Sequence, residues 1–188
     1  MRIVAVSGSL RRRSYNTSLL RAAAELAPGD VEISLLERDL IAAIPPYDAD
    51  VEGEGAPASV IELKRRIAEA DAVLFATPEY NSSVPGQLKN ALDWVSRPMA
   101  ENPLRGKPVL VVGASASAYG AVWAQAELRK VLGILGARNV DAEVAVSHAP
   151  ARFDEDGRLE DPVVREQLAD ALADLVAETT AASVAVAA

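Results

Sequence analysis

The sequence predicts an α/β protein: a doubly wound, five-stranded parallel sheet with helices on both faces. Apolar runs of strand length recur along the chain, and helical patterns fill the gaps between them. Three of these runs are apolar throughout, as is expected for strands that are buried on both faces. Strands that alternate with helices favour a parallel sheet, and five strands fit the order 2-1-3-4-5.

Five segments are expected to form the strands. They are Arg2–Val6, Val31–Leu36, Ala72–Thr77, Pro108–Gly113 and Val140–Val146. The continuous apolar runs are Ile3–Val6, Ala72–Ala76 and Val109–Val112. Val31–Leu36 instead alternates apolar and polar residues, which indicates an edge strand with one face exposed to solvent.

Five segments carry apolar residues at helical spacing and are expected to form the helices. They are Thr17–Ala27, Ala58–Ala70, Pro85–Val95, Ala121–Leu135 and Pro162–Ala177. Pro28-Gly29 ends the first of them, and Asp161 is a good N-cap for the last. Pro85 stands in a first turn, where proline is favoured. The long stretch Asp39–Pro57 is a connection.

The composition limits what the protein can be. With 188 residues, half of them apolar, we expect one domain over residues 1–178, followed by an alanine-rich tail, 179–188, that frays. A net charge of −8 argues against nucleic-acid binding. The chain has no cysteine and one histidine, which excludes thiol chemistry and histidine-rich metal sites. No apolar run approaches the ~20 residues that span a bilayer, and no signal-peptide pattern is present, so we expect a cytoplasmic protein.

The loop between the first strand and the first helix is rich in phosphate-binding side chains. It carries the hydroxyls of Ser9, Ser14 and Thr17, the amide of Asn16, and three arginines at Arg11–Arg13. A helix N-terminus presents unpaired N–H groups, and guanidinium donors match phosphate oxygens. The loop lacks G-x-G-x-x-G and the Gly-Lys-Ser/Thr ending, so a terminal monophosphate fits best. The alternative is a solvated turn with a helix cap.

Two further loops are expected to meet the first, because ligands bind in this fold where the winding direction reverses. In the loop after the third strand, Pro78 and Tyr80 offer apolar surface and Asn81 offers hydrogen bonds, which suits a flat polar heterocycle. The loop after the fourth strand, 113–120, is made of small residues that allow a ligand to approach the backbone. Either loop could instead be an ordinary turn-rich connection.

Taken together, these loops resemble the NADPH-dependent FMN reductase family, the flavodoxin-like group that includes quinone, chromate and azo-dye reductases. The resemblance is carried by Gly8-Ser9-Leu10-Arg11 with Ser14-Tyr15-Asn16, by Pro78-Glu79-Tyr80-Asn81 with Ser83-Val84-Pro85-Gly86, by Leu88-Lys89-Asn90, Asp93-Trp94 and Ser96-Arg97, and by Pro45-Pro46-Tyr47-Asp48-Ala49-Asp50. It covers most of residues 1–175. The chain departs from the pattern at Gly120-Ala121, where many relatives have a glycine pair.

The resemblance implies a flavodoxin-like domain that binds FMN non-covalently and uses NADPH or NADH as co-substrate. The FMN phosphate would be held by Ser9, Arg11, Ser14, Asn16 and Thr17. The isoalloxazine and ribityl would be lined by Pro78, Glu79, Tyr80 and Asn81, with Ser115 closing the other side. The flavin would carry the chemistry without a catalytic side chain, by ping-pong hydride transfer to a quinone, flavin, azo or metal-ion acceptor.

The resemblance also implies a homodimer or homotetramer, paired across the helices 85–95 and 121–135. Trp94, Trp123 and Leu128 are candidates for that contact, although they could simply face the sheet. Arg12 and Arg13 are expected to be exposed, meeting either the NADPH phosphate or a neighbouring subunit.

Two titratable residues invite a catalytic interpretation, and we favour another for each. His148 is expected to be a loop histidine rather than a general acid, because it follows the last strand and lies outside the three clustered loops. Glu79 is expected to fix its loop or a partner chain rather than act as a base.

Three other functions are compatible with parts of the sequence. A flavodoxin-type electron-transfer protein without efficient NAD(P)H turnover fits the acidic charge, but the phosphate loop of that family is rich in Thr and Gly and has no arginine. A regulatory protein could bind a nucleotide without catalysis. A phosphate-handling hydrolase would need a metal-binding carboxylate cluster after the first strand, and none is evident.

Overall fold

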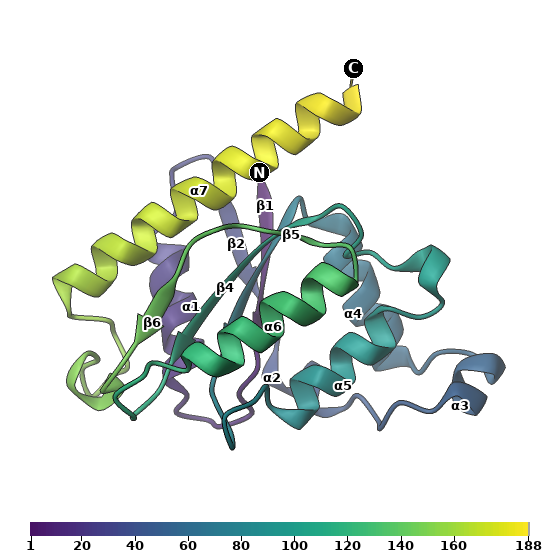
Figure 1. The fold of residues 1–188 in the computed structure, drawn as a ribbon, viewed down its shortest axis with the longest axis horizontal. Coiled ribbons are helices and arrows are strands. Elements are labelled where there is room, and N and C mark those ends of the chain that lie inside the picture. Colours follow the sequence, from purple (N-terminus) through teal and green to yellow (C-terminus); the bar gives the residue numbers. More distant parts are fainter. Residues whose placement is uncertain (188) are drawn as a thin grey trace.

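The computed structural model describes residues 1–187, which form a parallel sheet with helices on both faces (Figure 1). The strands are β1 (Arg2–Ser7), β2 (Glu32–Leu35), β3 (Ala72–Thr77), β4 (Pro108–Ala114), β5 (Arg138–Asn139) and β6 (Val144–Val146). The sheet runs in the order β2-β1-β3-β4-β5, and β6 also pairs with β4. All of these pairs are parallel, and the predicted order 2-1-3-4-5 is confirmed.

The fifth strand differs from the prediction. One continuous strand is expected over Val140–Val146, but only its last three residues form a strand, β6, which pairs beside Val112. The short strand β5 comes before the expected segment and pairs with the opposite end of β4, beside Pro108. Between β5 and β6 the chain leaves the sheet, and the carboxylates of Asp141 and Glu143 are exposed to water. Charged side chains are costly to bury, which accounts for the interruption.

The helices form two layers. They are α1 (Tyr15–Leu26), α2 (Arg38–Ala42), α3 (Ala49–Glu54), α4 (Ala58–Glu69), α5 (Gly86–Val95), α6 (Val122–Ile134) and α7 (Pro162–Ala187), with 3₁₀ turns at Met99–Glu101 and Ala149–Ala151. Alternate residues of β1 face the two layers: Ile3 and Ala5 pack with α1 and α7, whereas Val4 and Val6 pack with α4, α5 and α6. Helices on both faces are thereby confirmed.

The last helix is longer than its apolar pattern predicts. α7 continues ten residues beyond Ala177, through most of the expected tail, and its end extends beyond the sheet (Figure 1). Thr179 is buried, and its hydroxyl donates to the carbonyl of Leu175 at 2.6 Å. The segment 179–187 is therefore helical. Its fraying stays a prediction, and residue 188 lies outside the described residues.

The long connection 39–57 is tied to α5 by partly buried polar contacts. The indole N–H of Trp94 and the amide of Asn90 both donate to the carbonyl of Pro45 at 2.8 Å. The amide oxygen of Asn90 accepts the backbone N–H of Tyr47, whose ring meets Trp94 edge-on at 5.1 Å. Trp94 and Leu128 are buried in the chain's own core, so their assignment to a subunit contact is wrong.

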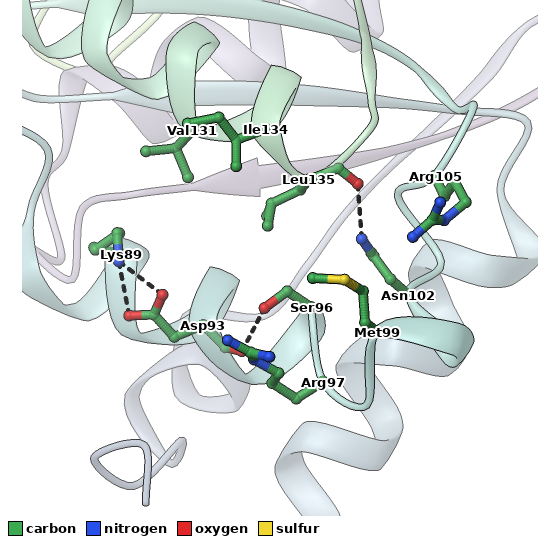
Figure 2. A pocket seen from close by; sticks show the side chains of 10 residues that line it. All are labelled: Lys89, Asp93, Ser96, Arg97, Met99, Asn102, Arg105, Val131, Ile134 and Leu135. Atoms are coloured by element: carbon green, nitrogen blue, oxygen red, sulfur yellow. Dashed lines mark hydrogen bonds and ion pairs between the residues drawn. The ribbon is translucent and has the colours of Figure 1, made fainter. Parts of the chain in front are cut away.

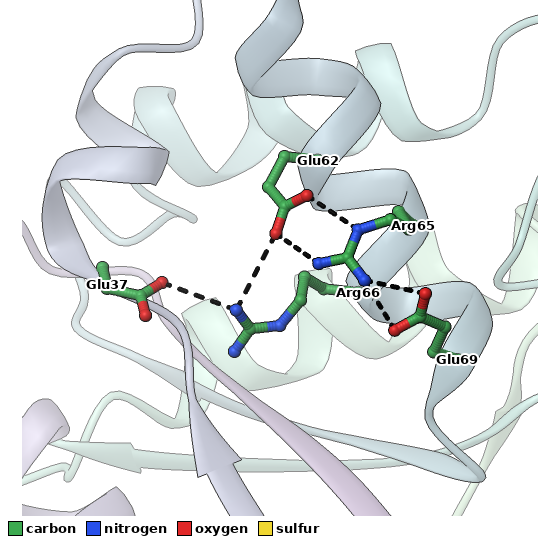
Figure 3. Close-up of polar contacts among 5 residues, drawn as sticks. All are labelled: Glu37, Glu62, Arg65, Arg66 and Glu69. Carbon is green, nitrogen blue, oxygen red and sulfur yellow. Dashed lines mark hydrogen bonds and ion pairs between the residues drawn. The ribbon is translucent and has the colours of Figure 1, made fainter.

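Ion pairs on the outer surface join α4 to the segment before α2 (Figure 3). Arg65 contacts Glu62 and Glu69 along the helix, and its hydrogen bonds lower the pKa of Glu62. Arg66 lies 3.9 Å from Glu37, which precedes α2. These side chains are exposed or half-exposed, so water and salt screen each pair and its contribution to stability is small. Among the described residues, no helix is long and apolar enough to cross a membrane.

Replacement of Gly120 tests how closely β6 approaches the loop after β4. Gly120 has a φ of +58°, and a Cβ built on it would lie 2.5 Å from the carbonyl carbon of Ala145. We expect Gly120→Ala to lower the free energy of unfolding by about 3 kcal/mol, measured by urea denaturation. The matched control is Gly29→Ala, where no atom lies within 4 Å and the free energy should change by less than about 1 kcal/mol. Equal stability of the two variants would contradict this account.

Candidate functional site

Three loops meet at the carboxyl ends of the strands and enclose a cavity of about 180 Å³, here called the loop cleft. They are the loops after β1, β3 and β4. Eight of the ten predicted site residues line it, namely Ser9, Arg11, Ser14, Asn16, Pro78, Glu79, Tyr80 and Ser115. Thr17 and Asn81 are absent from its lining. Tyr15, Ala114 and Ala116 also line it, and their only sequence signal is that each adjoins a predicted residue.

The loop after β1 is ordered by its own hydroxyl groups. Ser14 is the N-cap of α1, and its side chain accepts the N–H of Thr17 at 3.3 Å. The Ser9 hydroxyl accepts the N–H of Arg11 at 3.4 Å. The Thr17 hydroxyl donates to that of Ser7 at 3.0 Å, which holds it outside the lining of the cleft. The loop is thus shaped before any ligand arrives.

The donor groups left in this loop fit a phosphate. Within residues 1–187, the backbone N–H groups of Tyr15 and Asn16 meet no protein acceptor. The guanidinium of Arg11 is exposed and makes no hydrogen bond to the described residues. Unpaired N–H groups at a helix N-terminus beside a free guanidinium form an anion site, so these residues fit the phosphate of a mononucleotide.

Asn16 has a different contact from the one expected. Its side-chain amide donates to the carbonyl of Ala114 at 2.9 Å, and its amide oxygen accepts the N–H of Ala114 at 3.0 Å. Both groups are buried. Asn16 therefore joins the start of α1 to the end of β4, and it positions the loops on the two sides of the cleft.

The loop after β3 closes into a tight hairpin. Tyr80 and Ser83 exchange two backbone hydrogen bonds of 3.1 Å, and the two residues between them, Asn81 and Ser82, have φ values of 53° and 59°. This is the geometry of a two-residue turn that favours asparagine. The turn places Asn81 at an exposed tip, away from the lining of the loop cleft.

Two carboxylates fasten this hairpin to α6 from opposite sides. The carboxylate of Glu79 accepts the N–H groups of Trp123 and Ala124, both at 3.1 Å, and so caps the start of α6. The carboxylate of Glu127 accepts the Ser83 hydroxyl at 2.6 Å and the N–H of Val84 at 3.3 Å. These two hydrogen bonds lower the pKa of Glu127. Glu79 has the loop-fixing contacts expected of it.

We expected His148 to lie outside the three clustered loops, but the structure places its backbone against the loop after β4. Its backbone N–H donates to the carbonyl of Ser117 at 2.9 Å, and the next N–H donates to the carbonyl of Ser115 at 3.0 Å. The parallel pairing of β6 with β4 brings the two loops together, which corrects the prediction. The side chain of His148 is exposed and does not line the loop cleft.

A separate cavity of about 270 Å³ lies between the later turns of α5 and α6 (Figure 2). Its walls include the ion pair of Lys89 with Asp93 and the exposed side chains of Met99 and Ile134. It contains none of the predicted site residues. No group of three or more metal-ligating side chains is found among the residues that the structure describes.

The fold and the loop cleft define an α/β protein whose cleft, where the winding of the sheet reverses, fits a phosphate-bearing ligand. Comparison with known proteins specifies the class, because the family described as NADPH-dependent FMN reductase matches residues 1–151. This chain belongs to that family, and it is an oxidoreductase with a flavodoxin-like fold.

Individual relatives agree with this assignment. The chain is 44% identical over 167 residues to an NAD(P)H-dependent FMN reductase of Pseudomonas aeruginosa, with 88% of each chain covered. It is 46% identical over 138 residues to a quinone reductase of Escherichia coli K12, covering 73% of this chain and 72% of the relative. The solved flavoenzyme NAD(P)H:(acceptor) oxidoreductase FerB from Paracoccus denitrificans superposes with a TM-score of 0.83 at 35% identity, over 95% of this chain and 97% of that one.

Removal of the Asn16 amide tests the junction between α1 and β4. We expect Asn16→Ala to lower the free energy of unfolding by about 2–4 kcal/mol, because it leaves the buried N–H and carbonyl of Ala114 without partners. Asn139→Ala is the control, since that exposed amide makes one hydrogen bond to the carbonyl of Arg129 and should cost about 1 kcal/mol or less. A cost for Asn16→Ala no greater than the control's would refute the junction.

The pH dependence of stability tests the contact between Glu127 and the hairpin. Because its hydrogen bonds lower the pKa of Glu127 below the ordinary 4.5, their stabilisation is complete above that pH and is lost as the pH falls through the lower folded-state pKa. We therefore expect Glu127→Gln to be less stable than the unmodified chain at pH 7, with the difference closing below about pH 4.5, by urea unfolding at each pH. The exposed Glu166→Gln should show no such closing difference.

Proposed function

We propose that this chain is an NAD(P)H-dependent reductase whose domain, residues 1–178, binds FMN non-covalently in the loop cleft. Reducing equivalents would pass by ping-pong turnover to a small acceptor, such as a quinone, a flavin, an azo compound or a metal ion. The observation that carries the proposal is the unpaired donor set of Tyr15, Asn16 and Arg11 beside the aromatic and proline surface of one cavity.

The residues divide into those that hold the ligand and those that place them. Arg11 and the free N–H groups at the start of α1 hold the phosphate, and Ser9 and Ser14 shape that loop. Pro78 and Tyr80 offer apolar surface to the flat ring of the flavin. Because Tyr80 is half-exposed, the cleft stays open to solvent on that side. When bound, FMN supplies the hydride chemistry, so the chain needs no nucleophile of its own.

The wall opposite the hairpin is braced independently of it. The hydroxyl of Ser115 donates to that of Ser117 at 3.0 Å and accepts the N–H of Ser117 at 3.1 Å. The N–H of Ser115 is held by the carbonyl of Val146 at 3.0 Å. Both sides of the cleft are thus fixed in advance, which lowers the entropic cost of ordering a planar ligand.

A homodimer or homotetramer is part of the proposal. The exposed rings of Tyr119 and Trp123 lie 4.8 Å apart at the start of α6, beside the loop cleft, and Ile134 is 75% exposed at its end. Exposed apolar side chains that recur along one helix are typical of a protein–protein contact. Trp123 therefore remains a candidate for the subunit contact, and light scattering after size exclusion would give the stoichiometry.

Retention and bleaching of FMN test the proposed function. Protein soaked with FMN and desalted should keep a yellow flavin that NADPH bleaches without oxygen. We expect Arg11→Ala to raise the dissociation constant of FMN by about tenfold or more, because a charge-assisted hydrogen bond is lost, as measured by fluorescence titration. The exposed Arg38→Ala, outside the cleft, is the control.

Each outcome of that experiment has one meaning. A retained flavin that bleaches, and then reoxidises with a quinone, supports the reductase. A retained flavin that NADPH does not bleach favours an electron carrier instead. An affinity for FMN that Arg11→Ala leaves unchanged contradicts the site.

A further inference from the structure

A third cavity, of about 340 Å³, adjoins the loop cleft and is here called the arginine cavity. It shares Arg11, Ser14 and Tyr15 with the loop cleft. Beyond this common rim, its walls carry three further arginines and three acids, namely Arg12, Arg13, Arg21, Asp154, Glu155 and Asp156. None of these six residues lines the loop cleft.

The two walls of the arginine cavity are held against each other by specific contacts. Ser14, Ser18 and Arg21 follow one face of α1 at helical spacing. The segment 154–157 packs on that face so closely that a Cβ on Gly157, with φ of +81°, would lie 2.8 Å from the Ser18 hydroxyl. The guanidinium of Arg13 donates to the backbone carbonyl of Glu155 at 2.9 Å. The cavity is therefore a built feature of the fold.

Most of its charged groups remain available to a ligand. Over residues 1–187, no carboxylate lies within 4.0 Å of any of the four guanidiniums, and the three acids make no ion pair either. Asp154 is engaged by the backbone N–H of Arg158 at 2.7 Å. Four arginines against three acids give a locally positive surface in a chain with a net charge of −8. This is the composition of a site for an anion that also carries hydrogen-bond donors.

We infer that the arginine cavity binds the adenosine 2′-phosphate end of NADPH and so selects NADPH over NADH. The inference rests on the proposed function, in which the nicotinamide enters the loop cleft. The remainder of the bound dinucleotide then extends from the loop cleft into the arginine cavity, across the shared rim at Arg11 and Tyr15. A phosphomonoester dianion matches the forked donors of Arg12 and Arg21, which have no partner among the described residues.

The acidic wall favours a nucleotide over a simple anion. Carboxylates only accept hydrogen bonds, and the adenosine of either dinucleotide offers its amino group and its 3′-hydroxyl as donors. NADH presents these same donors but leaves the guanidiniums of Arg12 and Arg21 without an anion. Specificity then comes from the phosphate that NADH lacks. Arg13 is a positioning residue, because its guanidinium holds the segment that carries Glu155.

A binding measurement without turnover tests the inference. The FMN-loaded protein is titrated by calorimetry with adenosine 2′,5′-bisphosphate and, separately, with ADP. We expect the bisphosphate to bind about tenfold or more tightly than ADP, since it alone carries the 2′-phosphate. Arg12→Gln and Arg21→Gln should each weaken the bisphosphate by about tenfold and change ADP by less than about twofold. Lys130→Gln, which removes one exposed charge far along α6, should change neither.

The outcomes separate the inference from the proposed function. Equal affinities for the two probes, affinities that both arginine variants leave unchanged, or release of FMN by the bisphosphate would overturn the inference. Selective binding by a protein that retains no reducible flavin would support the phosphate site and overturn the reductase. Bleaching at the same kcat/KM with NADPH and NADH, unaltered in Arg12→Gln and Arg21→Gln, would support the reductase and overturn the inference.

Discussion

The paired hydrogen bonds between the Asn16 amide and the backbone of Ala114 are the interaction on which the loop cleft depends. They join the first turn of α1 to the end of β4, across a separation of 98 residues along the chain. A parallel sheet brings the carboxyl ends of its strands to one edge, but it does not set the distance between the loops that leave them. The buried amide of Asn16 sets that distance, because each of its two groups satisfies a backbone partner that water cannot reach.

The hairpin after β3 is held to α6 by the hydrogen bonds of two carboxylates. Glu79 and Glu127 place two carboxylates between the hairpin and α6, one at the start of that helix and one a turn later. Each carboxylate accepts two hydrogen bonds, so neither is free to act as a base without loosening the wall of the cleft. This explains why an acidic side chain, Glu79, lines a cleft for which an anionic ligand is proposed. The charge of Glu79 lies at the start of α6, where it is favourable, and that of Glu127 is used to hold the hairpin.

The sequence predicts the sheet and the location of the site because both depend on patterns that are local. Buried parallel strands are apolar runs, and the fold itself brings their following loops together. The contacts that decide the role of an individual side chain join residues that are far apart in the sequence. Asn16 looks equally suited to a phosphate and to a backbone partner, and Trp94 looks equally suited to a core and to an interface. The split of the fifth strand eludes a periodicity argument because Val140, Val144 and Val146 are buried in either arrangement.

In the proposed function and the inference that rests on it, the distribution of charge assigns complementary tasks to the two adjoining cavities. An acidic chain repels anions in general, so a phosphate-bearing ligand must be attracted by a local cluster of positive charge. All three consecutive arginines line the arginine cavity, and only the first also lines the loop cleft. One guanidinium with the helix N-terminus is sufficient for a resident monophosphate. The other arginines, facing acids that repel simple anions, favour a ligand that presents phosphate and hydrogen-bond donors together. That requirement would distinguish a dinucleotide co-substrate from inorganic phosphate.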